Sequence, residues 1–305
     1  MRKVNIMDKF YLVLIKKDGT IVHDIFATSH KDLVAKYLTS EEVKENNFFS
    51  AEFSPKDGHR IDDVENYSLI NSGMYYPDWF EGKFKLQVLA DLMVIIKSMI
   101  IKTRKKLLLH EGVILTNKAV IEEAKHCMIF AMYDETKIEI LDETSAVQIM
   151  TDDAVIEEML DGSKVIEMYG FSKIRKMKDY SKIVKMYGQA KVGEMHDHAR
   201  IAMLKGDANI MEMHEDAQAD RLKHMSRVDE MHGHSIIEEM WDWSIVEKMF
   251  DNSRINYMDE DSKVLEMYGD SMIEQMYGNA IVERLYENSL VRKLNDKAQI
   301  LSKEL

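Results

Sequence analysis

The sequence has very little cysteine and no long uncharged apolar run. A single cysteine, Cys127, among 305 residues excludes a disulfide framework and any multi-cysteine zinc or iron–sulfur site. The longest apolar stretch, residues 86–101, is interrupted by Asp91 and Lys97, which argues against a membrane span. Residues 10–15 are too short a run for an export signal, so we expect a cytoplasmic protein.

Signatures of enzyme chemistry are also missing from the sequence. It contains no glycine-rich phosphate loop, no Gly-x-Ser-x-Gly nucleophile elbow and no helical zinc-protease motif. Cys127 stands at a position that small residues occupy elsewhere, which indicates a core residue and not a nucleophile. We therefore predict a protein that is not an enzyme and uses no cofactor or metal.

What the sequence does contain is a nine-residue repeat that runs without insertion from Cys127 to the C-terminus. Residues 163–171 (Ser-Lys-Val-Ile-Glu-Met-Tyr-Gly-Phe) are one of twenty units, the last of them incomplete. Position 1 is always small, position 3 is Val or Ile except at Ala219, and position 6 is Met in fourteen units and Leu in five. Positions 7 to 9 hold turn-forming, polar or aromatic residues, with Asp, Glu or Gly at position 8 nearly throughout.

This pattern predicts a β-solenoid, that is, a parallel β-helix of nine-residue repeats. Small-x-aliphatic has a period of two, which places positions 1 and 3 on one side of a short strand. Position 6 can return inward only after the chain turns, and Asp or Gly at position 8 suits a second bend. One unit cannot bury its own apolar side chains, but stacked units can. Helical repeats, the competing interpretation, need about 33 to 47 residues per unit.

The ring-bearing residues at position 7 predict that two units form one coil. Every second unit carries a ring there in an uninterrupted column, whereas a register of three units breaks the column sooner. The column consists of His196, His214, His232, Phe250, Tyr268 and Tyr286. We therefore expect ten coils of 18 residues, about 48 Å long at roughly 4.8 Å per coil.

The first part of the chain has a different pattern and predicts an α+β cap domain over residues 1–110. Lys17-Asp18-Gly19 separates two apolar runs and indicates a hairpin, Ser29 can cap a short helix, and residues 48–53 suit a strand. Residues 83–108 show helical periodicity, and we expect this long helix to cover the first coil, since an open solenoid end needs a cap. Residues 111–126 form a bridge, and residues 127–305 form the solenoid.

The negative charge lies entirely in the repeat region. Residues 127–305 contain 36 Asp and Glu against 22 Lys and Arg, while the rest of the chain contains 18 against 19. Of the two alternating sets of units, the one that begins at Thr136 carries a net charge of -10 and the other -4. An acidic side could be complementary to an enzyme cleft that normally holds phosphates. Alternatively, the charges only keep the repeat soluble. Direct binding of nucleic acid is not expected of such a surface.

Outward aromatic and acidic residues form the candidate partner-binding site. Aromatic residues are favoured anchors in protein interfaces, although they also pack well on a solenoid face. The candidate residues are Glu238, Glu239, Trp241, Asp242, Trp243, Glu247, Phe250, Tyr268 and Tyr277. Stacked histidines at position 7 could share a metal, but their outward turn position favours a solvent-facing column of rings, so no metal is expected.

The small-x-aliphatic step resembles that of hexapeptide and pentapeptide β-helix proteins. With the Tyr-Pro-Asp-Trp-Phe segment at residues 76–80 and the Ser-x-Val-x-x-Met units, the chain resembles uncharacterised nonapeptide-repeat β-solenoid proteins of gut bacteria and their phages. Acidic pentapeptide rods that imitate DNA suggest a function: a phage-encoded, anti-CRISPR-like inhibitor that binds a host nucleic-acid-handling defence enzyme in the host cytoplasm. A structural or assembly module and a hexapeptide-acyltransferase-like enzyme are the alternatives, and a homodimer stays open.

Overall fold

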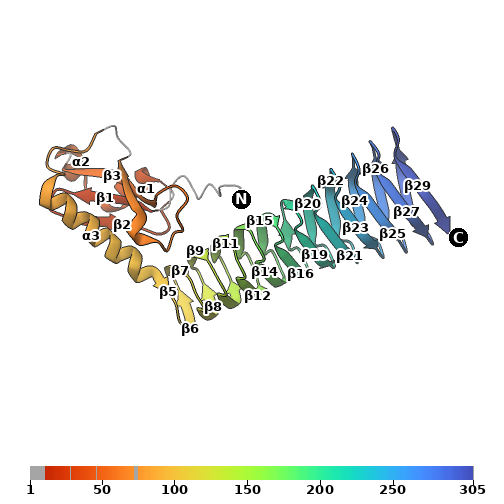
Figure 1. The fold of residues 1–305 in the computed structure, drawn as a ribbon, viewed down its shortest axis with the longest axis horizontal. Coiled ribbons are helices and arrows are strands. Elements are labelled where there is room, and N and C mark those ends of the chain that lie inside the picture. Colours follow the sequence, from red (N-terminus) through yellow and green to blue (C-terminus); the bar gives the residue numbers. More distant parts are fainter. Residues whose placement is uncertain (1–10, 28, 46, 72–74, 305) are drawn as a thin grey trace. The chain divides into compact units, whose positions relative to one another are not determined.

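The structure is a computed structural model that describes residues 11–27, 29–45, 47–71 and 75–304 (Figure 1). Two compact units make up the chain. The first consists of Met1–Ile101 with Gly112–Ile114, and the second of Lys102–Glu111 with Leu115–Leu305.

The first unit is built on a four-stranded antiparallel sheet with the strand order β2-β1-β3-β4. Its elements are β1 (Leu12–Lys16), β2 (Ile21–His23), α1 (His30–Tyr37), α2 (Ser40–Glu45), β3 (Phe48–Pro55), η1 (Val64–Asn66), β4 (Tyr67–Asn71) and α3 (Gly82–Met99). The predicted hairpin is confirmed as β1 and β2, although Phe10 lies outside the described residues. Ser29 caps α1 as expected, because its side chain accepts a hydrogen bond from the N–H of Asp32.

The predicted helix over residues 83–108 is wrong at its C-terminal end. Helix α3 stops at Met99, and the chain continues as β5 (Ile100–Ile101) and β6 (Lys105–Leu109). Strand β6 pairs in parallel with β8 (Val120–Lys125). Hydrogen bonds to a neighbouring strand therefore outweigh the helical apolar periodicity of this segment. A local sequence pattern carries no information about a strand that is distant in the sequence.

The segment predicted as a bridge, residues 111–126, contains two strands, β7 (Gly112–Leu115) and β8. Because β8 pairs with β10 (Lys137–Asp142), the parallel pairing of the solenoid begins before Cys127. The solenoid accordingly has about eleven coils in place of the ten expected.

Two parallel sheets form the solenoid, and each coil contributes one strand to each (Figure 1). The first sheet, called sheet A here, contains β6, β8, β10, β12 (Val155–Met159), β14 (Lys173–Met177), β16 (Lys191–Met195), β19 (Asn209–Met213), β21 (Arg227–Met231), β23 (Ile245–Met249), β25 (Lys263–Met267), β27 (Ile281–Tyr286) and β29 (Gln299–Glu304). Sheet B contains, from β9 onward, β9 (Met128–Met132), β11 (Ala146–Met150), β13 (Lys164–Met168), β15 (Lys182–Gly188), β17 (Arg200–Ile201), β18 (Leu204–Gly206), β20 (Gln218–Lys223), β22 (Ile236–Met240), β24 (Arg254–Met258), β26 (Met272–Met276) and β28 (Leu290–Leu294).

Paired strands are offset by 18 residues, as the ring column predicts. Val147 pairs with Val165, and Met150 pairs with Met168. The offset is 17 residues between β8 and β10, where Lys137 pairs with Val120. Equivalent positions of alternate units therefore stack directly on one another at the usual strand spacing of about 4.8 Å.

The core consists of the three predicted ladders at positions 1, 3 and 6. For example, Ser253, directly before β24, and Ile255 and Met258 within it are all fully buried. The expected turn before position 6 is wrong, however, because β24 includes Met258 and the chain turns only afterwards. In the pairing of β24 with β26, the residue at position 4 has no partner in register. The residues at positions 4 and 5 of β24 are both half-buried. This local break in strict alternation lets positions 3 and 6 face the same interior.

Candidate functional site

The corner between one strand and the next, at positions 7 to 9, carries a backbone requirement that explains the acidic repeat. All nineteen described residues at position 8 from Cys127 onward have a positive φ, between 48° and 79°. Twelve of them are Asp or Glu, six are Gly and one is His224. Glycine adopts this left-handed conformation freely, and Asp does so more readily than most other residues.

Ten of the twelve acidic side chains at position 8 also join successive coils. The carboxylate accepts a hydrogen bond from the backbone N–H of the residue at position 8 in the preceding coil. Asp242 accepts from His224 at 2.9 Å, and Glu260 accepts from Asp242 at 2.9 Å. The other acceptors are Asp134, Asp152, Asp179, Asp197, Glu215, Asp251, Glu287 and Asp296. We call this arrangement the carboxylate ladder.

The carboxylate ladder accounts for ten of the 36 acidic residues of the repeat. The hydrogen bond from the N–H of His224 lowers the pKa of Asp242, against the opposing effect of burial. By contrast, a hydrogen bond shared with Asp142 raises the pKa of Asp161, and burial and the neighbouring charges of Asp142 and Asp179 act in the same direction. Much of the negative charge therefore has a structural cause within the solenoid.

The predicted column of rings at position 7 is confirmed on the corners that follow the strands of sheet A. His196, His214, His232, Phe250, Tyr268 and Tyr286 stack in this order, with centroid distances of 4.7, 5.0, 4.8, 5.1 and 4.6 Å and interplanar angles of at most 10°. We call this the first ring column. Because each ring faces its neighbours, the column shows mainly ring edges to the surroundings.

A second ring column runs along the edge of sheet B, with Trp241 and Tyr277 on the corners after β22 and β26 and Tyr257 on β24 between them. The Trp241 ring is tilted by 40° against that of Tyr257, and Tyr257 stacks on Tyr277, with centroids 5.2 Å apart in both pairs. Lys223 extends the column, since its Nζ lies 5.4 Å from the centroid of the Trp241 ring. A hydrogen bond from the Tyr257 hydroxyl to Asp259 raises the pKa of Tyr257 to about 12.

The structure divides the predicted partner-binding residues between these two edges. Glu238, Glu239, Trp241, Asp242, Trp243 and Tyr277 lie on β22, β26 and the corners after them, in sheet B. Glu247, Phe250 and Tyr268 lie on β23, β25 and the corners after them, in sheet A. The nine residues therefore do not form one patch, because consecutive units alternate between the two sheets.

The three predicted glutamates already have partners within the solenoid. Glu238 accepts hydrogen bonds from Gln218 and Asn256, at 2.9 and 2.7 Å. Glu239 accepts one from the indole N–H of Trp241 at 3.1 Å, and Glu247 is paired with Arg227. These contacts orient the neighbouring side chains, so reversing the charges would disturb the surface itself as well as any partner.

The side chain of Trp243 is the most exposed of the predicted aromatic residues, at 62%. It occupies position 9 beside the second ring column. Met225, one coil earlier at the same position, is 60% exposed. We call Trp243 and Met225 together the exposed pair. Sequence reasoning missed Met225 and Lys223, although the 18-residue register places both on the same edge as Trp241.

The Nε2 atoms of the stacked histidines lie within hydrogen-bonding distance of neighbouring glutamate carboxylates. The Nε2 atoms of His196 and His214 each lie 2.9 Å from the glutamate two residues earlier, and that of His232 lies 3.1 Å from Glu230. Over the described ranges, no group of three or more His, Cys, Asp or Glu is arranged to hold a metal ion.

Potential nucleophiles of the repeat lie inside the solenoid. Cys127 is buried, and burial raises the pKa of its thiol. The hydroxyls of eight serines at position 1 and of Thr136 are buried without a hydrogen-bond partner: Ser163, Ser181, Ser226, Ser235, Ser244, Ser253, Ser262 and Ser271. Such side chains act as small spacers within the core.

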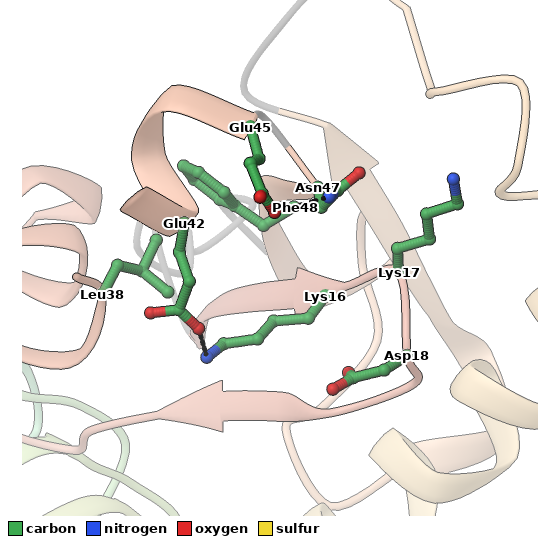
Figure 2. A pocket seen from close by; sticks show the side chains of 8 residues that line it. All are labelled: Lys16, Lys17, Asp18, Leu38, Glu42, Glu45, Asn47 and Phe48. Carbon is green, nitrogen blue, oxygen red and sulfur yellow. Dashed lines mark hydrogen bonds and ion pairs between the residues drawn. The ribbon is translucent and has the colours of Figure 1, made fainter. Parts of the chain in front are cut away.

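A separate pocket in the first compact unit contains an ion pair between two of its lining residues (Figure 2). It is lined by Lys16, Lys17, Asp18, Leu38, Glu42, Glu45, Asn47 and Phe48. Lys16 and Glu42 form an ion pair of 2.6 Å, and Glu42 also accepts a hydrogen bond from the N–H of Thr39. These contacts, with that of Lys16 the strongest, lower the pKa of Glu42 to about 2. The pair joins β1 to α2.

Among the residues that the structure describes, no helix has the length and apolar character needed to cross a membrane. Comparison with protein-family models, curated proteins and solved structures finds no match to the chain.

Proposed function

We propose that the chain is a non-enzymatic protein-binding inhibitor, encoded by a phage, that acts on a host nucleic-acid-handling defence enzyme such as a CRISPR effector. In this proposal each nine-residue repeat is half a coil. The first compact unit, which contains the four-stranded sheet, caps the solenoid, and the repeat region supplies the binding surface. The observation that carries the proposal is the exposed pair, Trp243 and Met225, beside the second ring column.

The exposed pair has the chemistry of an interface anchor. Tryptophan is enriched among the residues that dominate binding energy, and methionine is enriched in interfaces generally. Asp242, between the two tryptophans, is bonded to the coils on either side through the carboxylate ladder. A surface that is already rigid loses little conformational entropy on binding.

The charge of the solenoid supports a basic partner. Its net charge of -14 arises from 36 acidic and 22 basic residues in residues 127–305. Although ten of these acids have a structural role in the carboxylate ladder, their negative potential still attracts a positively charged surface. Enzymes that hold nucleic acid present such surfaces.

The test is affinity capture from a bacterial lysate with the wild-type chain and the double variant Trp243→Ala/Met225→Ala. We expect the wild type to retain a nucleic-acid enzyme at low salt, to release it at high salt and to inhibit its activity when purified. The double variant should retain it much less. Phe171→Ala is a matched control, because Phe171 is 64% exposed at position 9 of the same edge, four coils away.

Two results would count against the proposal. One is the absence of any nucleic-acid enzyme from the low-salt capture. The other is equal capture by the wild type and the double variant, with circular dichroism showing that both are folded.

A further inference from the structure

A basic segment interrupts the acidic solenoid. Residues 164–205 contain ten Lys and Arg against four Asp and Glu, a net charge of +6. Residues 127–163 before them carry one base and ten acids, and residues 206–305 after them carry 11 bases and 22 acids. The net charge therefore changes from -9 to +6 and then to -11 along the repeat, so the surface potential changes sign twice. We call residues 164–205 the basic segment.

Along the basic segment, one edge of the solenoid lacks the acidic residues of position 8. At the corners that follow the strands of sheet B, three consecutive coils have glycine there, namely Gly170, Gly188 and Gly206. Glycine satisfies the positive φ of this position without adding a negative charge. At the corners that follow the strands of sheet A, the neighbouring residues at position 8 are all acidic, namely Asp161, Asp179 and Asp197. The positive charge of the basic segment is therefore least opposed at the edge with the glycines.

Each of the three coils presents an unpaired lysine at this edge. Lys173 and Lys191 lie at position 2 of β14 and β16, directly after the corner, and pair in register. Lys205 lies at position 7 on β18. None of the three forms an ion pair or a side-chain hydrogen bond with a described residue, whereas Lys176 and Lys185 are paired with glutamates at 2.8 and 3.0 Å. Because coils stack at about 4.8 Å, the unpaired lysines are spread over about 10 Å of the edge.

An exposed aromatic ring lies on the same edge. Phe171, at position 9 directly after Gly170, is 64% exposed. On the same corners, Tyr169 and Tyr187 stack on one another, with centroids 5.1 Å apart and an interplanar angle of 13°. Phe171 is therefore the ring that is most open to a ligand. We call Lys173, Lys191, Lys205 and Phe171 together the basic edge.

Single-stranded nucleic acid suits this combination of charge and ring. Proteins bind single strands without sequence preference through cations that follow the phosphate backbone and aromatic rings on which bases stack. A double helix fits less well, because its bases already stack on one another and its second backbone would approach the acidic coils on either side. An acidic peptide could pair with the lysines, but its carboxylates make no use of the ring, whereas every base has an aromatic face.

We propose that the basic edge binds a short stretch of single-stranded nucleic acid. The lysines contact successive phosphates, and Phe171 stacks on a base. The acidic coils before and after the basic segment limit the length of the bound strand, because their charge repels further phosphates. The expectation against nucleic acid rests on the net charge of the whole repeat, which conceals the basic segment. The basic edge is separate from the exposed pair, and the inference does not depend on the proposed function.

The test is a titration of a fluorescein-labelled strand of about eight thymidines with the full chain, followed by fluorescence anisotropy at about 50 and 200 mM salt. Three phosphate contacts on a single strand should make the association constant fall about twentyfold between these conditions, as about the -2.1 power of the salt concentration. In Lys173→Gln/Lys191→Gln one contact remains, so the fall should be about threefold. This variant should also bind the strand at least about tenfold more weakly than the wild type at the lower salt concentration.

Two further variants separate stacking from charge and one edge from the other. Phe171→Ala should weaken binding by about fivefold or more but leave its salt dependence unchanged. Lys164→Gln/Lys182→Gln is the matched control, because these two lysines pair in register at the opposite end of the sheet B strands and also form no ion pair with a described residue. It should bind the strand within about twofold of the wild type. Circular dichroism verifies that each variant is folded.

The proposal is overturned if the strand shows no saturable binding, or if the basic-edge lysine variant or Phe171→Ala binds it as well as the wild type does. It is also overturned if a labelled peptide of the same number of glutamates binds as tightly as the strand, because the edge then recognises negative charge alone, or if a duplex of the same length binds more tightly. Trp243→Ala/Met225→Ala should leave strand binding unchanged, and Phe171→Ala should leave capture of the enzyme unchanged, so failure of this inference is distinguishable from failure of the proposed function.

Discussion

Replacing Asp242 by alanine should destabilise the solenoid locally, because this side chain has two structural roles. Its backbone φ is 58°, and its carboxylate accepts the N–H of His224 at 2.9 Å. Alanine in the left-handed conformation costs about 1 to 2 kcal/mol, and loss of the hydrogen bond costs about 0.5 to 1.5 kcal/mol. We therefore expect a loss of about 1.5 to 3.5 kcal/mol.

Two further substitutions separate these contributions. Asp242→Gly removes the backbone strain but loses the hydrogen bond and adds freedom to the unfolded chain, so the loss should be about 1 to 2 kcal/mol. Asp242→Asn retains an acceptor oxygen and tolerates a positive φ, so it should cost least. Asp207→Ala is the matched control, because Asp207 is exposed at position 9 of the same edge and its side chain has no hydrogen bond to a described residue.

Hydrogen exchange is the appropriate assay, since a repeat protein can open locally without unfolding as a whole. The amide of His224 should exchange about five to thirty times faster in Asp242→Gly than in the wild type, because each 1.4 kcal/mol corresponds to about tenfold. Equal stability of the alanine and asparagine variants, with unchanged protection of His224, would refute the structural role of the carboxylate ladder.

Ser253→Ala should leave stability within about 0.5 kcal/mol of the wild type or increase it, because the buried hydroxyl has no hydrogen-bond partner; a loss above about 1 kcal/mol in urea unfolding would show that the hydroxyl is bonded. The pKa of Glu194 is lowered to about 2, mainly by Lys176, so this ion pair stabilises the fold above pH 4.5 and its contribution disappears as the pH falls towards 2. Lys176→Met should move the Glu194 titration, followed by carbon NMR, towards 4.5, and an unmoved titration would contradict the pairing.

The candidate site was predicted only in part from the sequence. The 18-residue register placed His196 to Tyr286 in one column, because equivalent residues of stacked strands must lie above one another. It did not reveal that Glu238 and Glu247 have internal partners, since the geometry of those contacts depends on side chains one coil away. The exposure of Met225 was missed for the same reason. The end of α3 at Met99 depends on strand pairing that no local pattern reports.

The sequence by itself determined which positions of the repeat face inward and that the chain bends at position 8, but the turn it predicted before position 6 is wrong. Small residues at position 1, aliphatic residues at position 3, and Met or Leu at position 6 have few other places to be buried, and Asp or Gly at position 8 marks a left-handed backbone. Only the tertiary structure decided why that position is so often acidic. The carboxylate meets its donor, the N–H of a residue 18 positions earlier, only when two coils are stacked, and local preferences do not reach that far.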